Sequence, residues 1–164
     1  MDTLAVIAKR RSIRKFAPKP VPRDVLEKLV DAGRLAPTAR NDQPWEFIVI
    51  TGPGELKKLG ELTDYGKFIA EAPACIAVVC RSTKYYLEDG CAATENILIA
   101  ATSLGVQSCW VAGDKKNYAL GILKELNVPP SYNLVSLIPL GYAATDGKNV
   151  PKRELAKVLH WEKF

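Results

Sequence analysis

The sequence predicts an α+β fold in a single domain, on the basis of three observations. Helical and strand-like segments mix along the 164 residues without the regular strand–helix–strand spacing of a doubly wound parallel sheet. Hydrophobic residues make up 48% of the chain, which is enough for one well-buried core in a length too short for two comfortable domains. No internal repeat or low-complexity tract appears in the sequence. We therefore expect residues 1–164 to form a single domain.

The N-terminal third predicts two helices and a strand. Apolar residues at positions 4, 6, 7 and 13 are typical of a short amphipathic helix, and the proline-rich segment 17–22 then forces an extended crossing. A second helix begins at residues 22–24, follows the 3.6-residue period and stops at Pro37. A polar, proline-bounded loop follows, and residues 45–51 are then typical of a buried strand.

The middle of the chain alternates helices and strands. After a Gly-Pro-Gly turn we expect a short helix over residues 55–62 and a loop around Gly66, before a strand over residues 74–80. Residues 87–104 are the longest helical candidate, and this segment is small and apolar on most faces. Such a helix is buried in a large core or at a subunit interface, and the interface gains weight in a small domain.

The C-terminal third predicts the remaining core elements. Gly105 is expected to cap the long helix, and residues 106–112 to form a short strand ending at Gly113. A helix over residues 116–126 and a last core strand over residues 132–140 follow. The chain then closes with a loop over residues 146–153 and an amphipathic segment that contains Leu155, Val158, Leu159 and Trp161.

Residues 9–19 carry six basic side chains and no carboxylate. Arg10, Arg11, Ser12 and Arg14 supply planar guanidinium groups and a hydroxyl, which suit a phosphate or an anionic ring. The other interpretation is a solvated charge run at the end of an amphipathic helix, where cations also interact favourably with the helix dipole. Taken alone, the segment favours this second interpretation, so the remaining segments decide between them.

Several catalytic classes lack their motifs in this chain. Neither G-x-G-x-x-G after a strand nor G-x-x-x-x-G-K-[ST] occurs, which disfavours the usual dinucleotide and nucleotide sites. His160 is the one histidine and has no nucleophile elbow near it, so we interpret it as structural rather than as part of a hydrolase triad. The acidic residues form no clear catalytic pair. If the chain is an enzyme, a cofactor is expected to supply the chemistry, with no catalytic side chain.

The cysteines and the hydropathy of the chain indicate the cellular compartment in which the protein acts. Cys75, Cys80, Cys91 and Cys109 show no C-x-x-C pair and no nearby histidine, so we expect reduced core thiols and no metal site. No apolar run reaches membrane-spanning length and the first residues lack a signal-peptide layout, which predicts a cytoplasmic protein without a membrane partner. The net charge of +5 does not choose between nucleic acid and an acidic cofactor.

Three segments together resemble the flavin-dependent nitroreductases in their short single-domain form. Residues 10–16, Arg-Arg-Ser-Ile-Arg-Lys-Phe, resemble the opening flavin motif of that family, and residues 36–45 resemble its A-P-S-x-x-N-x-Q-P-W loop. Pro151-Lys152-Arg153 followed by His160-Trp161 is similar to its C-terminal phosphate-binding segment. The resemblance implies a nitroreductase-like fold with a central mixed, mostly antiparallel sheet flanked by helices. It also implies an intertwined homodimer that binds FMN at the subunit interface.

The resemblance further implies which residues contact FMN. Arg10, Arg11 and Ser12, with Lys152 and Arg153, would hold the phosphate and ribityl end. Arg14 would lie toward the pyrimidine edge, where a cation stabilises the reduced ring. The residues expected to line the ring and its polar edge are Pro37, Thr38, Ala39, Asn41 and Gln43, the first three of them from the second subunit.

A last segment would pass along the flavin ring. It comprises Trp110, Val111, Ala112 and Gly113, and the backbone N–H of Ala112 or Gly113 would face N5. Lys67 is the nearest candidate for a further ring contact. Structural roles stay open for several of these residues: Trp110 as a core aromatic, Gly113 as a turn, and Lys152 with Arg153 as a solvated pair.

We therefore expect an FMN-dependent NAD(P)H oxidoreductase of the nitroreductase or quinone reductase type. Hydride would pass by a ping-pong cycle through flavin N5 to a nitroaromatic, quinone or similar small acceptor. One alternative is a non-catalytic flavin-binding or storage protein with the same pocket. A second is a basic nucleic-acid-binding module, for which the sequence lacks aromatic interleaving, a helix-turn-helix pattern and zinc ligands.

Overall fold

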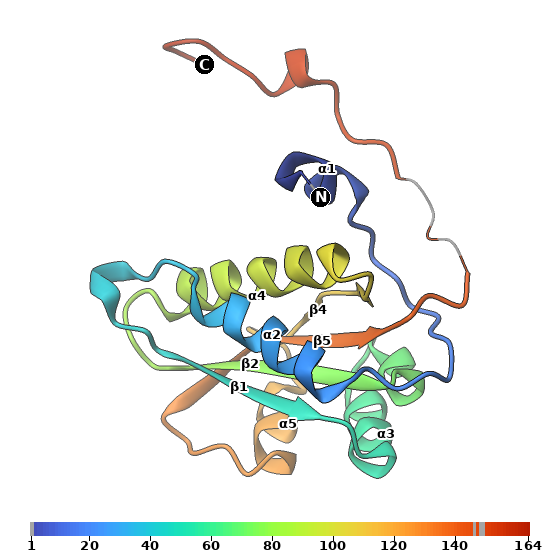
Figure 1. Cartoon of the computed structure of the whole chain (residues 1–164). Coiled ribbons are helices and arrows are strands. Elements are labelled where there is room, and N and C mark those ends of the chain that lie inside the picture. The colour runs from blue at the N-terminus through green and yellow to red at the C-terminus, as the bar shows by residue number, and fades with distance from the viewer. Residues whose placement is uncertain (1, 146, 148–149) are drawn as a thin grey trace.

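A five-stranded sheet lies at the centre of the computed structural model, which describes residues 2–145, 147 and 150–164 (Figure 1). The strand order is β1-β2-β5-β3, with β4 also paired to β5, and every pairing between these strands is antiparallel. The predicted mostly antiparallel sheet is confirmed. The strands are β1 (Trp45–Ile50), β2 (Ala74–Arg81), β3 (Gln107–Ser108), β4 (Val111–Ala112) and β5 (Tyr132–Gly141).

Within the described residues, the chain forms five α-helices and three short 3₁₀ helices, of which η3 (Leu155–Lys157) lies in the C-terminal segment away from the sheet. Each α-helix follows a predicted helical pattern, although boundaries shift by up to a few residues. The α-helices are α1 (Thr3–Lys9), α2 (Arg23–Arg34), α3 (Pro53–Leu62), α4 (Tyr86–Ser103) and α5 (Ala119–Glu125), and the 3₁₀ helices are η1 (Ala39–Asn41), η2 (Lys67–Glu71) and η3 (Leu155–Lys157). None of the helices in the described part of the chain is long and apolar enough to cross a membrane.

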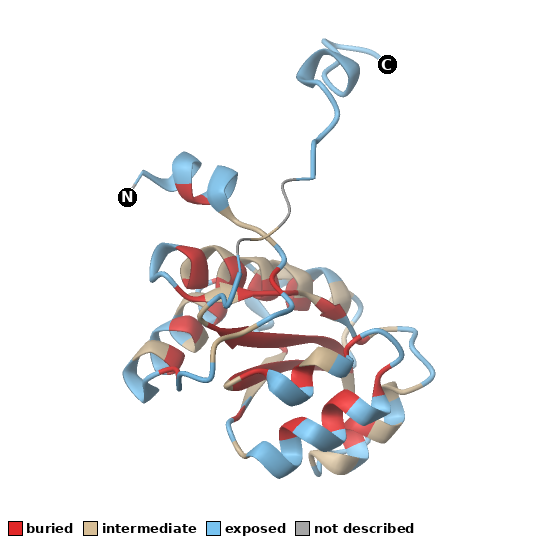
Figure 2. Ribbon diagram, turned by 90° about the vertical axis from the view of Figure 1, so that its right-hand side faces the viewer, coloured by how far each residue is buried: buried red, intermediate tan, exposed pale blue. Residues whose placement is uncertain are grey.

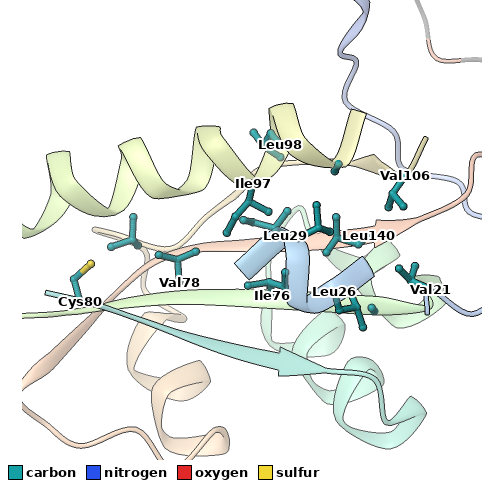
Figure 3. Close-up of a cluster of buried hydrophobic side chains, with 14 residues drawn as sticks. Val21, Leu26, Leu29, Ile76, Val78, Cys80, Ile97, Leu98, Val106 and Leu140 are labelled. Atoms are coloured by element: carbon teal, nitrogen blue, oxygen red, sulfur yellow. The ribbon is translucent and has the colours of Figure 1, made fainter. Parts of the chain in front are cut away.

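The helices cover both faces of the sheet, so the chain has two layers of buried side chains. Side chains of α2 and α4 pack on one face with Ile76, Val78 and Leu140 of the strands (Figure 3). Side chains of α3 and α5 pack on the other face with Ala77 and Leu137. Because β2 is covered on both sides, all its residues up to Cys80 are buried, as Figure 2 shows for the central strands. This explains its uninterrupted apolar sequence.

The predicted strand over residues 106–112 divides into β3 and β4. Cys109, between the two parts, donates its N–H to the Pro139 carbonyl oxygen at 3.3 Å. Proline has no N–H to donate in return, so the ladder is interrupted at that pair. The break therefore depends on Pro139 of β5. β3 and β4 still keep one common register against β5.

The two ends of the chain differ from the sequence-based expectation. The opening helix stops at Lys9 instead of extending to Ile13, because Ile13 is buried beside β3 in an extended segment. The amphipathic C-terminal segment leaves the body of the molecule, and residues 150–164 are all exposed (Figures 1 and 2). In the loop predicted over residues 146–153, positions 146, 148 and 149 lie outside the described residues.

Candidate functional site

The basic segment lies in an extended conformation between β3 and the end of β5. Ser12 forms a parallel bridge with Ser108, and Ile13 donates its N–H to the Ser108 carbonyl oxygen at 2.9 Å. Further along, Phe16 forms a bridge with Ala143. Because Ile13 points into the core, its neighbours Ser12 and Arg14 are exposed on the opposite side. The segment is thus fixed by the sheet rather than carried on a helix end.

A pocket of about 610 Å³ opens over this segment. It brings together Arg10, Arg11, Ser12 and Arg14 with Lys152 from the C-terminal segment. Lys15 adds a fifth basic side chain, and none of the described lining residues carries a carboxylate. Such a set of guanidinium, ammonium and hydroxyl donors fits a phosphate group. The remaining lining residues are Ile13, Thr145, Gly147 and Val150.

The arginines of the pocket are oriented by different contacts. Arg10 lies 3.7 Å from a carboxylate oxygen of Glu95 on α4, and Arg11 donates to the Ala8 and Arg10 carbonyl oxygens at 2.7 Å each. The Arg14 guanidinium lies 5.9 Å from the centre of the Phe68 ring in η2. Arg14 therefore points toward η2, away from the contacts that orient Arg10 and Arg11.

The loop around Gly66 packs against β4. A side chain at Gly66 would place its Cβ 3.0 Å from the Val111 side chain and 2.7 Å from the Thr63 hydroxyl, so only glycine permits this approach. Lys67, the first residue of η2, is exposed next to it. The structure thus places Lys67 near the segment that contains Val111.

The segment from Trp110 to Gly113 lies along β5, and its two candidate N–H groups point in opposite directions. Gly113 donates its N–H to the Val135 carbonyl oxygen at 3.0 Å, so this donor is directed into the sheet. Bonded and non-bonded pairs alternate along an antiparallel ladder, and Ala112 therefore occupies a non-bonded position opposite Ser136. Its N–H points away from β5. Of the two predicted donors, Ala112 is the one available to a ligand.

The loop over residues 37–43 is not brought to this pocket within one chain. It is held near the beginning of α4, where Asp89 accepts the Ala39 N–H at 2.9 Å. β3 and the basic segment lie toward the other end of α4, an 18-residue helix of roughly 27 Å (Figure 1). The predicted contacts that lie in this separate loop are Pro37, Thr38, Ala39, Asn41 and Gln43.

The two basic residues of the C-terminal motif are also separated. Lys152 lines the pocket, whereas Arg153 is exposed and donates to the Lys157 carbonyl oxygen at 2.7 Å. Thus the structure brings Lys152, and not Arg153, to the other basic side chains. Lys15, Thr145 and Val150 line the pocket without having been singled out from the sequence, although Lys15 belongs to the basic run.

Two ionisable groups, one beside the basic segment and one at the start of α4, have shifted pKa values. Burial raises the pKa of the Cys109 thiol, and the nearby Arg14 and a hydrogen bond to Ser12 oppose this only in part, so the thiol is neutral. Tyr86, at the start of α4, donates its hydroxyl to Asp114 at 2.6 Å. This hydrogen bond raises the pKa of Tyr86 to about 12. Within the described ranges, His, Cys, Asp and Glu side chains form no group that could hold a metal ion.

Comparison with known proteins adds independent information. The model of the Nitroreductase family matches residues 7–86 and 65–142 of this chain. A protein of Methanothermobacter thermautotrophicus, provisionally named NADH dehydrogenase/NAD(P)H nitroreductase, is 36% identical and aligns over 100% of this chain and 88% of its own. Among solved structures, an FMN-dependent nitroreductase from Clostridium difficile R20291 superposes with a TM-score of 0.91 at 29% identity, covering 98% of this chain and 99% of that one.

A second solved structure contains a bound ligand. It is a complex with FMN from Desulfovibrio desulfuricans, provisionally named a nitroreductase. It covers 100% of this chain and 98% of its own, with a TM-score of 0.89 at 29% identity. The arrangement of sheet and helices described above is therefore shared with these proteins.

Proposed function

The chain belongs to the nitroreductase family, and on that premise we propose that it is an FMN-dependent NAD(P)H oxidoreductase acting on a nitroaromatic, quinone or similar small acceptor. The observation that carries the proposal is the pocket with five basic side chains and no carboxylate among its described lining residues. The relatives named for NAD(P)H nitroreduction and the structure with bound FMN support it.

The donors present fit FMN along its length. Arg10, Arg11, Ser12 and Lys152 would hold the phosphate and the adjacent ribityl chain. Arg14, directed toward η2, would lie at the pyrimidine edge of the ring. The Ala112 N–H points away from β5 and would face the flavin ring. Arg153 does not line the pocket, and it would reach the FMN phosphate only if the C-terminal segment moved.

When bound, FMN would supply the hydride-transfer chemistry that links NADH or NADPH to the acceptor in a ping-pong cycle. The protein's own contribution is binding, orientation and charge. Arg14 contributes a fixed positive charge beside the place where negative charge develops on reduction. The Ala112 N–H contributes a backbone donor whose direction is set by the ladder with β5. No side chain in the described site needs to act as a general acid or base.

A homodimer would complete the site. The loop with Pro37, Thr38 and Ala39 lies toward the opposite end of α4 from the basic pocket of the same chain. We propose that each subunit places this loop over the FMN of the other. The small, apolar helix α4 would then lie at the subunit interface, in agreement with its composition.

The exposed C-terminal segment provides a second contact between subunits. Its apolar side chains Leu155, Val158, Leu159 and Trp161 are 43 to 77% exposed. Strand β1 forms an edge of the sheet, and beside it α2 borders a groove of about 720 Å³ with an apolar floor that includes Leu26 and Phe47. We propose that the C-terminal segment of one subunit lies in this groove of its partner, because both are uncovered apolar surfaces in one chain.

We also propose that the protein acts in the cytoplasm. All four cysteines are free thiols, of which Cys75, Cys80 and Cys109 are buried. Reduced thiols throughout a chain are typical of a reducing compartment.

The first test is a visible absorption spectrum of the purified dimer, followed by chromatography of the released cofactor. We expect flavin bands, release of FMN on denaturation, and bleaching when NADH or NADPH is added without oxygen. A quinone such as menadione should then restore the colour. A protein that is colourless and does not take up added FMN would overturn the proposal. Flavin that neither pyridine nucleotide bleaches would instead indicate a flavin-binding protein without this activity.

A further inference from the structure

A buried carboxylate on α4 holds the first part of the loop over residues 38–43. Asp89 lies in the first turn of α4 and is only 4% exposed. One of its carboxylate oxygens accepts the backbone N–H of Ala39 at 2.9 Å. A hydrogen bond to a charged acceptor is stronger than one between neutral groups, so Asp89 is a firm attachment point for an otherwise polar segment.

The loop needs such an attachment because its backbone is strained. Arg40, Asn41 and Gln43 have φ angles of 56°, 58° and 45°, in the left-handed region that residues with a Cβ seldom adopt. Its far end is held by a bond within the loop, from the Gln43 N–H to the Thr38 hydroxyl at 3.2 Å, and by the Arg81 side chain, which donates to the Asp42 carbonyl oxygen at 3.1 Å. Conformations of this kind persist where surrounding structure imposes them. Asp89 is the group on α4 that does so.

The carboxylate is kept in an environment that is unfavourable for it. Its second oxygen, Oδ2, is buried and has no hydrogen-bond partner among the described residues. Burying an incompletely satisfied carboxylate costs free energy, and the position of Asp89 in the first turn of α4, where the helix dipole favours an acid, offsets part of that cost. The one bond it makes to another element goes to the loop.

We propose that Asp89 is a positioning residue that holds the loop over residues 38–43 in the conformation that meets the flavin of the partner subunit. This inference rests on the proposed function for the identity of the ligand. It does not make Asp89 a catalytic residue, because its contact with the loop is through the Ala39 backbone. The direct consequence is that the loop's order depends on an acceptor at position 89.

The test compares Asp89→Ala with Asp89→Asn and a control on the same helix. Asparagine keeps an oxygen that can accept the Ala39 N–H, whereas alanine removes it. Thr94→Val is the matched control: Thr94 is fully buried on α4 and bonds to the Ser136 hydroxyl at 2.8 Å, away from the loop. Two quantities are measured on the dimer: hydrogen exchange of residues 38–43 without FMN, and the dissociation constant of added FMN.

We expect Asp89→Ala to speed exchange in the loop and to raise the FMN dissociation constant about tenfold, the effect of one such hydrogen bond. In Asp89→Asn, loop exchange and the FMN dissociation constant should return most of the way to the wild-type values. Thr94→Val should change neither quantity, even if it lowers the melting temperature as much as Asp89→Ala does. Unchanged loop exchange in Asp89→Ala would overturn the anchoring role. Altered exchange with wild-type FMN affinity would overturn the link to the flavin and leave the proposed function intact. If the wild type itself binds no FMN, the proposed function fails, and the exchange data still decide the anchoring role.

Discussion

The backbones of Ser12 and Ser108 lie side by side in a parallel bridge, and the adjacent Ile13 N–H donates to the Ser108 carbonyl oxygen. This contact joins a segment near the N-terminus to the short strand that follows the longest helix. It places Arg14 near Cys109, in the segment that leads into β4, although nothing local in the sequence links the two. The proposed flavin site depends on this pairing.

Arg14 is expected to contribute directly to FMN binding. Arg14→Ala removes a cation from the pocket while leaving Ile13, which anchors the segment, in the core. We expect the FMN dissociation constant to rise about tenfold or more, measured by quenching of flavin fluorescence, with an unchanged far-UV spectrum. Lys57→Ala is the control, since Lys57 on α3 is 72% exposed, forms a surface ion pair with Glu61 and lines neither the basic pocket nor the groove beside α2. Equal FMN affinity in both variants would contradict this role for Arg14.

Two glycines on helices should respond to alanine in opposite ways. A Cβ at Gly90 would lie 2.6 Å from a methyl group of Val135, so Gly90→Ala overpacks the contact between α4 and β5 and should cost about 1–3 kcal/mol of stability. A Cβ at Gly54 would meet nothing within 4 Å. Gly54→Ala should therefore stabilise α3 by roughly 0.5–1 kcal/mol. Urea unfolding measures both, and a stable Gly90→Ala variant would contradict the close approach.

The C-terminal segment is expected to hold the dimer together. Trp161 is 77% exposed in one chain, and Trp161→Asp should weaken association because it places a charge where an apolar contact is proposed. Light scattering at decreasing protein concentration would show the shift toward the 18.0 kDa monomer. Leu120→Asp, at a leucine of α5 that is 79% exposed, is the control and should leave the dimer unchanged. A wild type that is monomeric at every concentration would rule out the dimer.

The Tyr86–Asp114 hydrogen bond should make stability depend on pH in alkali. It raises the pKa of Tyr86 from 10.0 to about 12, so the folded state holds the phenol proton more tightly than the unfolded chain. This contribution is complete below pH 10 and is lost as the pH rises toward about 12. The stability advantage of the wild type over Tyr86→Phe should thus be larger at about pH 8 than at about pH 11.

Urea unfolding at both pH values measures that advantage. Tyr65→Phe, at a phenol that is 87% exposed, serves as the control for general loss of stability in alkali. If the stability advantage of the wild type over Tyr86→Phe increased with pH, the result would contradict a stabilising role for this hydrogen bond.

The sequence predicted element types well where the apolar pattern was long. The helix over residues 87–104 and the strand over residues 74–80 agree with α4 and β2 to within about one residue, because burial on several faces leaves a continuous apolar run. The break between β3 and β4 could not be predicted from residues 106–112. It depends on Pro139 in the facing strand, and strand partners are set by the whole fold.

The site was predictable only in part, for the same reason. The basic run at residues 10–14 was visible as a concentration of charge, but its position beside Ser108 required long-range pairing. Either Ala112 or Gly113 could have offered its N–H, and only the register with β5 distinguishes them. The sequence shows Asp89 only as one of several acidic residues in a predicted helix, because the residue type does not reveal that the side chain is buried.

The central position of β5 has a consequence for the synthesis of the protein. Tyr132–Gly141 is the last strand along the chain, yet it pairs with β2, β3 and β4. Until Tyr132–Gly141 leaves the ribosome, β2 has β1 beside it but an open edge on its other side, whose backbone N–H and carbonyl groups have no partner strand. Nascent chains should therefore be prone to aggregate late in translation, and slower synthesis at low temperature or more abundant chaperone should raise the soluble yield.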